Sequence, residues 1–149
     1  MTTVSDILRR KDTRIITVRL RETAATAAMI MKREKIGALV VKDVCRSEGS
    51  NVTVGVLSER DLAQAVAKYG AAAMNKPVAE LLPSAFVSCS EHDSIEAVMR
   101  LMLERELRVV PVMQEHALIG VVTMRDLIPF LLPNAKIGSP AMAQPTARA

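Results

Sequence analysis

One short segment occurs twice in this chain of 149 residues, as GVLSERDL at 55–62 and as GVVTMRDL at 120–127. The upstream residues repeat as well: 15–41 aligns with 86–112, and VSDIL near the N-terminus aligns with VAELL before the second copy. The spacing is 65 residues in the motif and 71 upstream, because the turn around KDVCRSEGSN is longer than the turn around MQEHAL. Self-similarity of this kind predicts two copies of one structural unit, followed by a tail.

Each copy is predicted to fold in the order β-α-β-β-α. Apolar residues in the first helix of each copy recur at the i, i+3, i+4 and i+7 positions of one helix face. In the first copy the expected elements are strand Ile15–Val18, a helix with Ala24, Ala27, Ala28 and Met31 on its apolar face, strands GALVV and VTVGVL, and a helix at Leu62–Tyr69. In the second copy they are strand Phe86–Cys89, a helix with Ile95, Val98, Met99, Met102 and Leu103 on that face, strands RVVPV and LIGVV, and a helix at Leu127–Leu132.

A single unit of about 60 residues buries its apolar faces poorly by itself. We therefore expect an α/β (α+β) fold in which two pseudo-symmetric units pack through their sheets. The first unit, with an N-terminal lead-in, is expected at 1–70, a linker at 71–77 and the second unit at 78–132. The tail at 133–149 is rich in Pro, Ala and small polar residues, so we expect it to be disordered.

Composition excludes several classes of protein. The chain has no apolar run of about 20 residues, which argues against a membrane span, and the N-terminus lacks the apolar stretch of a secretory signal, so a cytoplasmic location is expected. The net charge is only +4, and its one basic cluster, Arg9, Arg10, Lys11 and Arg14, is sparse for a nucleic-acid arm. Aromatic residues are limited to Phe86, Phe130 and Tyr69, so base-stacking platforms, and with them nucleic-acid binding, are not expected.

Cysteine and histidine do not form a convincing reactive site in the sequence. Cys89 and His92 have a C-x-x-H spacing, but zinc needs further ligands in place, and SEHDS is more typical of a helix start. Cys45 in the long turn is expected to be an exposed thiol, and His116 to be a solvated histidine in a hairpin turn. Since no nucleophile, base and acid come together in the pattern, we expect neither a metal site nor an enzyme.

The repeated motif has a purely structural interpretation. Ser58 or Thr123 would be the N-cap of the following helix, with its hydroxyl accepting a backbone hydrogen bond. Asp61 or Asp126, three residues later, would complete a capping box.

A second interpretation is ligand binding. Arg60 and Arg125 fall in the first helical turn, where a cation is unfavourable unless something negative lies nearby. A hydroxyl and a carboxylate three residues apart can together bind a sugar diol. Gly55 or Gly120, three residues before the hydroxyl, would let a ligand approach the backbone. The motif is therefore a candidate ribose-phosphate site, present twice.

The pattern G-h-h-[ST]-x-x-D in GVLSERD and GVVTMRD, with KIGALVV and LRVVPV before it, resembles a tandem pair of CBS domains over 4–132. The resemblance implies clefts between the repeats that bind an adenosine-containing ligand, such as AMP, ADP, ATP, NAD(H) or S-adenosylmethionine. It also implies a homodimer formed through the helices, a regulated protein partner and no catalytic cofactor. A nucleotide-independent interaction scaffold is the alternative.

Site residues follow from the resemblance. The implied ribose contacts are Ser58, Asp61, Thr123 and Asp126. The implied phosphate contacts are Arg60, Arg125, Arg108 and Lys35, although Lys35 is equally well explained as a solvated surface residue. The implied adenine slot is formed by Ile15, Ala38, Phe86, Val109 and Val110. Met124 stands where the first copy has the charged Glu59, so we expect the two clefts to differ.

Overall fold

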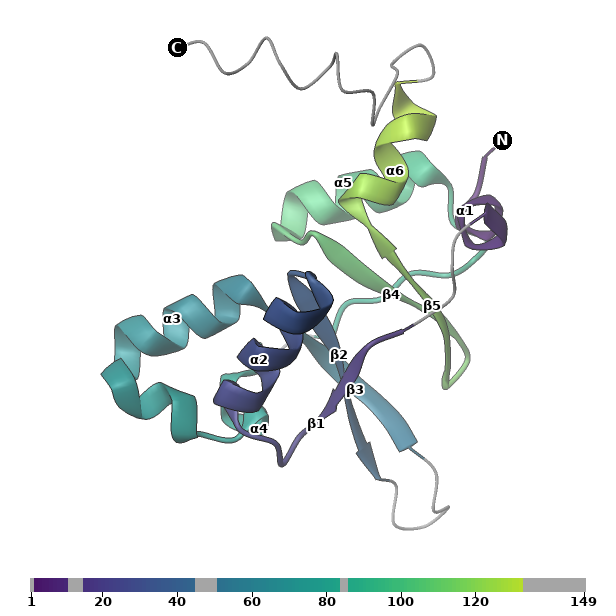
Figure 1. Ribbon diagram of the computed structural model, residues 1–149. Helices are drawn as coiled ribbons and strands as arrows, with labels where there is room; N and C mark the ends of the chain where they lie inside the picture. The colour runs from purple at the N-terminus through teal and green to yellow at the C-terminus, as the bar shows by residue number, and fades with distance from the viewer. Residues whose placement is uncertain (1, 11–14, 45–50, 84–85, 133–149) are drawn as a thin grey trace, which may run out of the picture.

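The computed structural model describes residues 2–10, 15–44, 51–83 and 86–132 (Figure 1). The middle of the long first turn, with Cys45, and the tail at 133–149, whose disorder is a prediction, lie outside these residues. The described chain mixes helices with two small sheets, which confirms the predicted fold class. It forms two lobes, each with its own core.

The first lobe is built on a three-stranded sheet in the order β1-β2-β3. Strand β1 is parallel to β2, which is antiparallel to β3. Its elements are β1 (Thr17–Arg19), α2 (Ala24–Glu34), β2 (Ala38–Val44), β3 (Asn51–Ser58), α3 (Glu59–Tyr69), the 3-10 helix η1 (Gly70–Asn75) and α4 (Val78–Leu81). Helix α3 ends at Gly70, whose φ of 68° favours glycine.

The second lobe repeats this plan with the antiparallel hairpin β4-β5. Its elements are α1 (Val4–Arg10), α5 (Ile95–Arg105), β4 (Val109–Gln114), β5 (Ala117–Thr123) and α6 (Met124–Leu131). The two hairpins carry an irregularity at the same place, between Val41 and Lys42 in one and between Val112 and Met113 in the other. The repeat in sequence is therefore a repeat in backbone detail.

The predicted strand Phe86–Cys89 does not form, and only Cys89 makes a parallel bridge, to Val112. In the first lobe the N–H group of Val40 donates to the carbonyl of Ile16 over 3.3 Å. The residue that corresponds to Val40 is Pro111, 71 positions later, and proline has no N–H group to donate. Pairing in the second lobe is therefore limited to Cys89. In the first lobe the strand predicted at Ile15–Val18 forms as β1, Thr17–Arg19.

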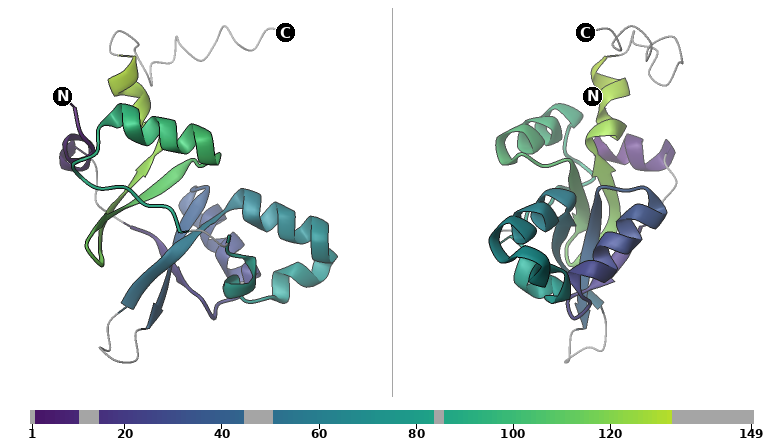
Figure 2. Two further views of the ribbon diagram at one scale, coloured as in Figure 1. Left: turned by 180° about the vertical axis from the view of Figure 1, so that it is seen from behind. Right: turned by 60° about the vertical axis from the view of Figure 1, so that its left-hand side comes forward.

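The two lead-in helices are exchanged between the lobes (Figures 1 and 2). Helix α1 contributes Val4 and Ile7 to the second core, and α4 contributes Val78 and Leu81 to the first. Equivalent backbone bonds hold both in place: Val4 N–H donates to the Asp93 carbonyl over 3.0 Å, and Val78 N–H to the Glu22 carbonyl over 2.7 Å. Each core is thus completed by the segment that precedes the other repeat in sequence.

The segment expected to be a linker is packed. Ala73 of η1 is fully buried in the first core, and the Lys76 ammonium lies 4.4 Å from the centre of the Tyr69 ring.

On α5, Leu103 is 65% exposed, which corrects its predicted place on the buried face.

The lobes meet through their sheets, as predicted, because β3 contacts both β4 and β5. Within the described ranges, no helix has the length and apolar character needed to cross a membrane.

Candidate functional site

Both repeated motifs lie where a strand passes directly into a helix. Ser58, the last residue of β3, is the N-cap of α3 and accepts a hydrogen bond from the Asp61 N–H group over 3.2 Å. The Asp61 Oδ2 atom accepts two bonds in return, from the N–H and the hydroxyl of Ser58, each over 2.8 Å. This is a complete capping box, so the structural interpretation of the motif holds in the first lobe.

The second motif has the same geometry. The Thr123 N–H group donates to Asp126 Oδ2 over 2.8 Å, and the Asp126 N–H group donates to the Thr123 hydroxyl over 3.1 Å. Both acids are partly exposed. A carboxylate offers about four lone-pair positions, so an acid in a capping box can also accept hydrogen bonds from a ligand.

The ladders bring the predicted adenine-slot strands to these caps. Ala38 is the partner of Ser58 across the β2-β3 ladder, and Val109 is the partner of Thr123 across β4-β5. Successive residues of a strand face opposite sides, and Val110 is fully buried in the second core. Val109 therefore faces the cleft, whereas Val110 does not, which corrects the prediction that both line one slot.

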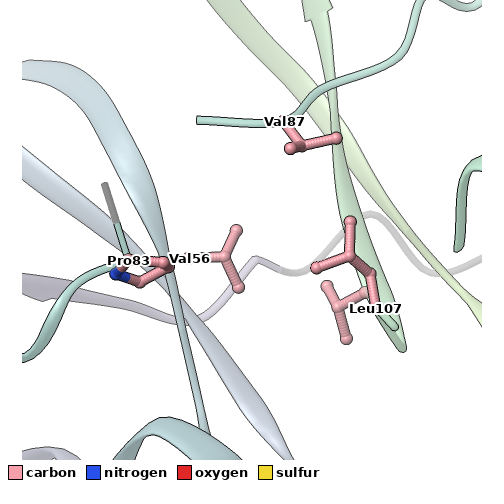
Figure 3. A pocket seen from close by; sticks show the side chains of 5 residues that line it. Val56, Pro83, Val87 and Leu107 are labelled. Carbon is pink, nitrogen blue, oxygen red and sulfur yellow. The ribbon is translucent and has the colours of Figure 1, made fainter. Parts of the chain in front are cut away.

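A hollow lies between the lobes (Figure 3). It is close to Thr123, because its lining residue Val109 is the ladder partner of Thr123. Its volume is about 40 Å³, and it is lined by Val56, Pro83, Val87, Leu107 and Val109. Figure 3 shows Val56 and Pro83 on one side and Val87 and Leu107 on the other. Small-molecule pockets usually measure about 300–1,000 Å³, so this hollow is much smaller than a typical ligand site.

The predicted slot residues and the lining residues overlap only at Val109. Phe86 is 43% exposed, and its neighbour Val87 lines the hollow instead. Ile15 is half-buried and is not a lining residue. Four lining residues are not among the predicted slot residues: Val56, Pro83, Val87 and Leu107. The strand alternation that excludes Val110 indicates Leu107, two residues before Val109.

The four cations predicted to contact phosphate are all exposed. The Arg60 Nη1 atom lies 3.1 Å from Glu106 Oε2 in the other lobe. Lys35 is the C-cap of α2, in a left-handed conformation. Arg108 precedes β4, and its carbonyl accepts the Met124 N–H group over 2.9 Å. Arg125 lies in the first turn of α6, while the nearby Met124 packs on the second core.

The motif glycines do not face a ligand site. A Cβ atom at Gly55 would lie 3.5 Å from Leu82, and one at Gly120 would lie 2.7 Å from Leu8. Both leucines belong to the exchanged lead-in segments. Gly120 admits the Leu8 side chain, whereas Leu82 makes an ordinary contact distance at Gly55. This corrects the inference that the glycines leave room for a ligand.

Cys89 and His92 point into different environments. The Cys89 side chain is buried, and this burial, with Asp93 nearby, raises the pKa of its thiol to about 12. The His92 side chain is 84% exposed, beside Glu91. Among the residues that the structure describes, no three His, Cys, Asp or Glu side chains are grouped as metal ligands.

Comparison with known proteins accounts for the repeat. The model of the CBS domain matches residues 3–68 and 72–133. The CBS domain-containing protein YhcV of Bacillus subtilis is 29% identical over 139 residues, 93% of this chain and 92% of that protein. The crystal structure of the CBS-domain containing protein ATU1752 from Agrobacterium tumefaciens is 32% identical, with a TM-score of 0.76, and the match covers 85% of this chain and 91% of that one.

Two more distant structures share the fold and hold ligands. CBSX2 in complex with AMP is 24% identical, with a TM-score of 0.68, over 89% of this chain and 98% of that one. The CBS domain pair of MJ0100, in complex with 5′-methylthioadenosine and S-adenosyl-L-methionine, is 23% identical, with a TM-score of 0.73, over 91% and 99%. With both repeats matched by the family model and the fold shared, the chain belongs to the CBS-domain family as a tandem pair.

Proposed function

We propose that the chain is a non-catalytic regulatory module that binds an adenosine-containing ligand in the cleft of the second lobe. The observation that carries the proposal is the apolar hollow beside Thr123, because it puts an apolar opening between the lobes next to a hydroxyl and a carboxylate. The adenine ring would occupy the hollow, between Val56 and Val109. The ribose would reach Asp126, and any phosphates would lie near Arg125.

Two observations support this assignment. An apolar hollow with a few polar groups at its rim is the usual form of a small-molecule site. The related pairs CBSX2 and MJ0100 hold adenosine-containing ligands. The ligand of this chain belongs to the same class under the proposal, with AMP, ADP, ATP, NAD(H) and S-adenosylmethionine as the candidates.

The proposed output is a change in binding to a partner protein. The hollow is lined from both lobes, so an occupant would favour one arrangement of the lobes over others. The size of that effect is limited to the difference in ligand affinity between the arrangements. A cytoplasmic homodimer assembled through the helices is the proposed functional form.

A nucleotide-independent interaction scaffold is the second candidate. The two capping boxes explain the hydroxyl and carboxylate of each motif without any ligand. This observation means that the motif alone does not establish binding, so the test has to separate a cap from a ligand contact.

The chain offers a matched control for that purpose. Asp6 caps α1 as Asp126 caps α6, since its Oδ2 atom accepts the Thr3 N–H group over 2.9 Å, but Asp6 belongs to the lead-in helix and not to the repeated motif. Both Asp6→Ala and Asp126→Ala remove a carboxylate that accepts an N–H group at the start of a helix. Only Asp126→Ala also removes the proposed ribose contact.

The experiment is a thermal-shift panel on nucleotide-free protein with AMP, ADP, ATP, NAD⁺, NADH and S-adenosylmethionine. A ligand at 100 times its Kd stabilises the folded state by about 2.7 kcal/mol, which raises the Tm of a chain this size by roughly 5–10 °C. We expect that rise in the wild type and in Asp6→Ala, and its loss in Asp126→Ala. A panel that leaves the wild-type Tm unchanged would favour the scaffold, and an undiminished rise in Asp126→Ala would remove the ribose assignment.

A further inference from the structure

An ion pair joins the two lobes at one of the two clefts. The Arg60 guanidinium in the first turn of α3 lies 3.1 Å from the Glu106 carboxylate, at the end of α5. Figure 1 shows this end of α5 close to the start of α3. The cation nearest the Ser58–Asp61 cap is therefore already matched by an anion of the other lobe.

The repeat assigns an equivalent to each member of this pair. Glu106 corresponds to Lys35, 71 residues earlier. Both are left-handed C-caps, with φ and ψ of 55° and 44° at Glu106 and 57° and 45° at Lys35. Arg60 corresponds to Arg125, 65 residues later, and both lie in the first turn of a helix that begins with a capping box.

The equivalent pair at the other cleft has the same charge twice. Figures 1 and 2 show the C-terminal end of α2, where Lys35 lies, directed toward the start of α6, where Arg125 lies. One cleft therefore has a basic and an acidic residue, Arg60 and Glu106, whereas the other has two basic residues, Arg125 and Lys35. The cleft with two bases is also the one with the hollow of Leu107 and Val109.

We propose that the two clefts sort adenosine derivatives by charge, an inference that rests on the proposed function. The cleft of Thr123 and Asp126 takes the phosphorylated ligand, because Arg125 and Lys35 together attract its phosphates. The cleft of Ser58 and Asp61 takes derivatives without phosphate, because Glu106 neutralises Arg60 and repels an anion brought beside it.

The strengths of the ion pair and of a phosphate contact favour this division of ligands between the two clefts. Side chains as exposed as Arg60 and Glu106, at 57% and 69%, gain little stability from their pairing. A charged neighbour nevertheless decides whether a second anion is attracted or repelled at short range. A charge-assisted hydrogen bond to phosphate is enough to change affinity about tenfold.

Two charge-reversing substitutions exchange the charge patterns of the two clefts. Glu106→Lys gives the first cleft two bases, and Lys35→Glu gives the second cleft an acid beside Arg125. Glu115→Lys is the control for the first reversal, since Glu115 is exposed and left-handed but lies in the β4-β5 turn. Lys68→Glu, at the far end of α3, is the control for the second.

The test is calorimetric titration of nucleotide-free protein with ADP and, separately, with adenosine. For ADP we expect one strong site per wild-type chain, a second site in Glu106→Lys and about tenfold weaker binding in Lys35→Glu. Adenosine binding should be unchanged in both variants, and the two controls should bind ADP as the wild type does.

Two failures are distinguishable. If adenosine binds but the reversals leave ADP affinity and stoichiometry unchanged, the charge-sorting inference is overturned and the proposed function stands. If neither ADP nor adenosine binds the wild type, the inference is overturned, and if AMP, ATP, NAD⁺, NADH and S-adenosylmethionine also fail to bind, the proposed function fails with it.

Discussion

The Cδ2 atom of Leu8 lies 2.7 Å from the point where a side chain at Gly120 would place its Cβ atom. Leu8 follows Ile7 on α1, and Gly120 is buried in the middle of β5. This contact seats the N-terminal helix on the second lobe. At the equivalent place in the first lobe, Leu82 leaves 3.5 Å for a Cβ atom at Gly55, which is an ordinary contact distance.

The two glycines should therefore respond differently to alanine. Gly120→Ala forces the flexible end of the Leu8 side chain to turn aside, so we expect a cost at the low end of the roughly 1–3 kcal/mol typical of overpacking. Gly55→Ala has room, and it reduces the freedom of the unfolded chain, which typically stabilises by about 0.4–1 kcal/mol. Urea unfolding measures both free energies of unfolding. Equal losses in the two variants would contradict the packing difference, and adding Leu8→Ala should relieve Gly120→Ala but not Gly55→Ala.

Burial makes Cys89 an unreactive thiol. Desolvation, with Asp93 adding to it, raises the pKa of Cys89 from 9.0 to about 12, and the thiolate is the reactive form. In a Cys45→Ser background, DTNB at pH 8 should label Cys89 only after denaturant is added. Labelling of the native protein at the rate of a free thiol would show that the site is open.

The raised pKa of Cys89 also makes the stability of the folded protein depend on pH. A raised thiol pKa means that the folded state keeps its proton while the unfolded state releases it, so the stability contribution is complete below pH 9.0 and is lost progressively toward pH 12. A Cys89→Ala variant, whatever its overall stability, should lose this component of the alkaline decline.

The lowered pKa of Asp6 should make stability depend on pH in the acid range. The Thr3 N–H group donates to its carboxylate and lowers the pKa of Asp6 below 3.8, with Arg9 acting in the same direction. A lowered carboxyl pKa contributes stability that is present above pH 3.8 and is lost as the pH falls through the folded-state pKa. The difference in unfolding free energy between the wild type and Asp6→Asn should therefore shrink in acid. A difference that stays constant from pH 6 to the acid limit would contradict the capping role.

Sequence reasoning predicts this fold well where the signal is local. The doubled motif and the apolar periodicity predict two units, and each N-cap lies at the predicted Ser58 or Thr123. The sequence also contains the reason why the strand before Cys89 fails, because Pro111 lacks the N–H group that Val40 uses. That reason becomes visible only when the two copies are compared residue by residue.

Other features depend on contacts between distant parts of the chain. Nothing in the order of the segments indicates that α1 joins the second core and α4 the first. The doubled motif predicts Thr123 and Asp126 as polar contacts of the candidate site, whereas Val56, which lines the hollow from the other lobe, carries no such signal. The pairing of Arg60 with Glu106 likewise requires the lobes to be placed side by side.

That pairing should matter little for folding. Both side chains are largely exposed, and double-mutant cycles on such pairs typically give about 0.2–1 kcal/mol. A cycle with Arg60→Gln and Glu106→Gln should therefore show a coupling below about 1 kcal/mol, and it should weaken with added salt. A much larger coupling would mean that the pair holds the lobes together.

The most direct measurement of the central claim is valine-methyl NMR of nucleotide-free protein during titration with AMP, ADP and S-adenosylmethionine. Val87 and Val109 line the hollow, whereas the adjacent Val110 is fully buried in the core. The account predicts saturable shifts at Val87 and Val109 with at least one of these compounds, and smaller shifts at Val110. If Val87 and Val109 stay unmoved at saturating concentrations of all three, the hollow is not a site for adenosine-containing ligands.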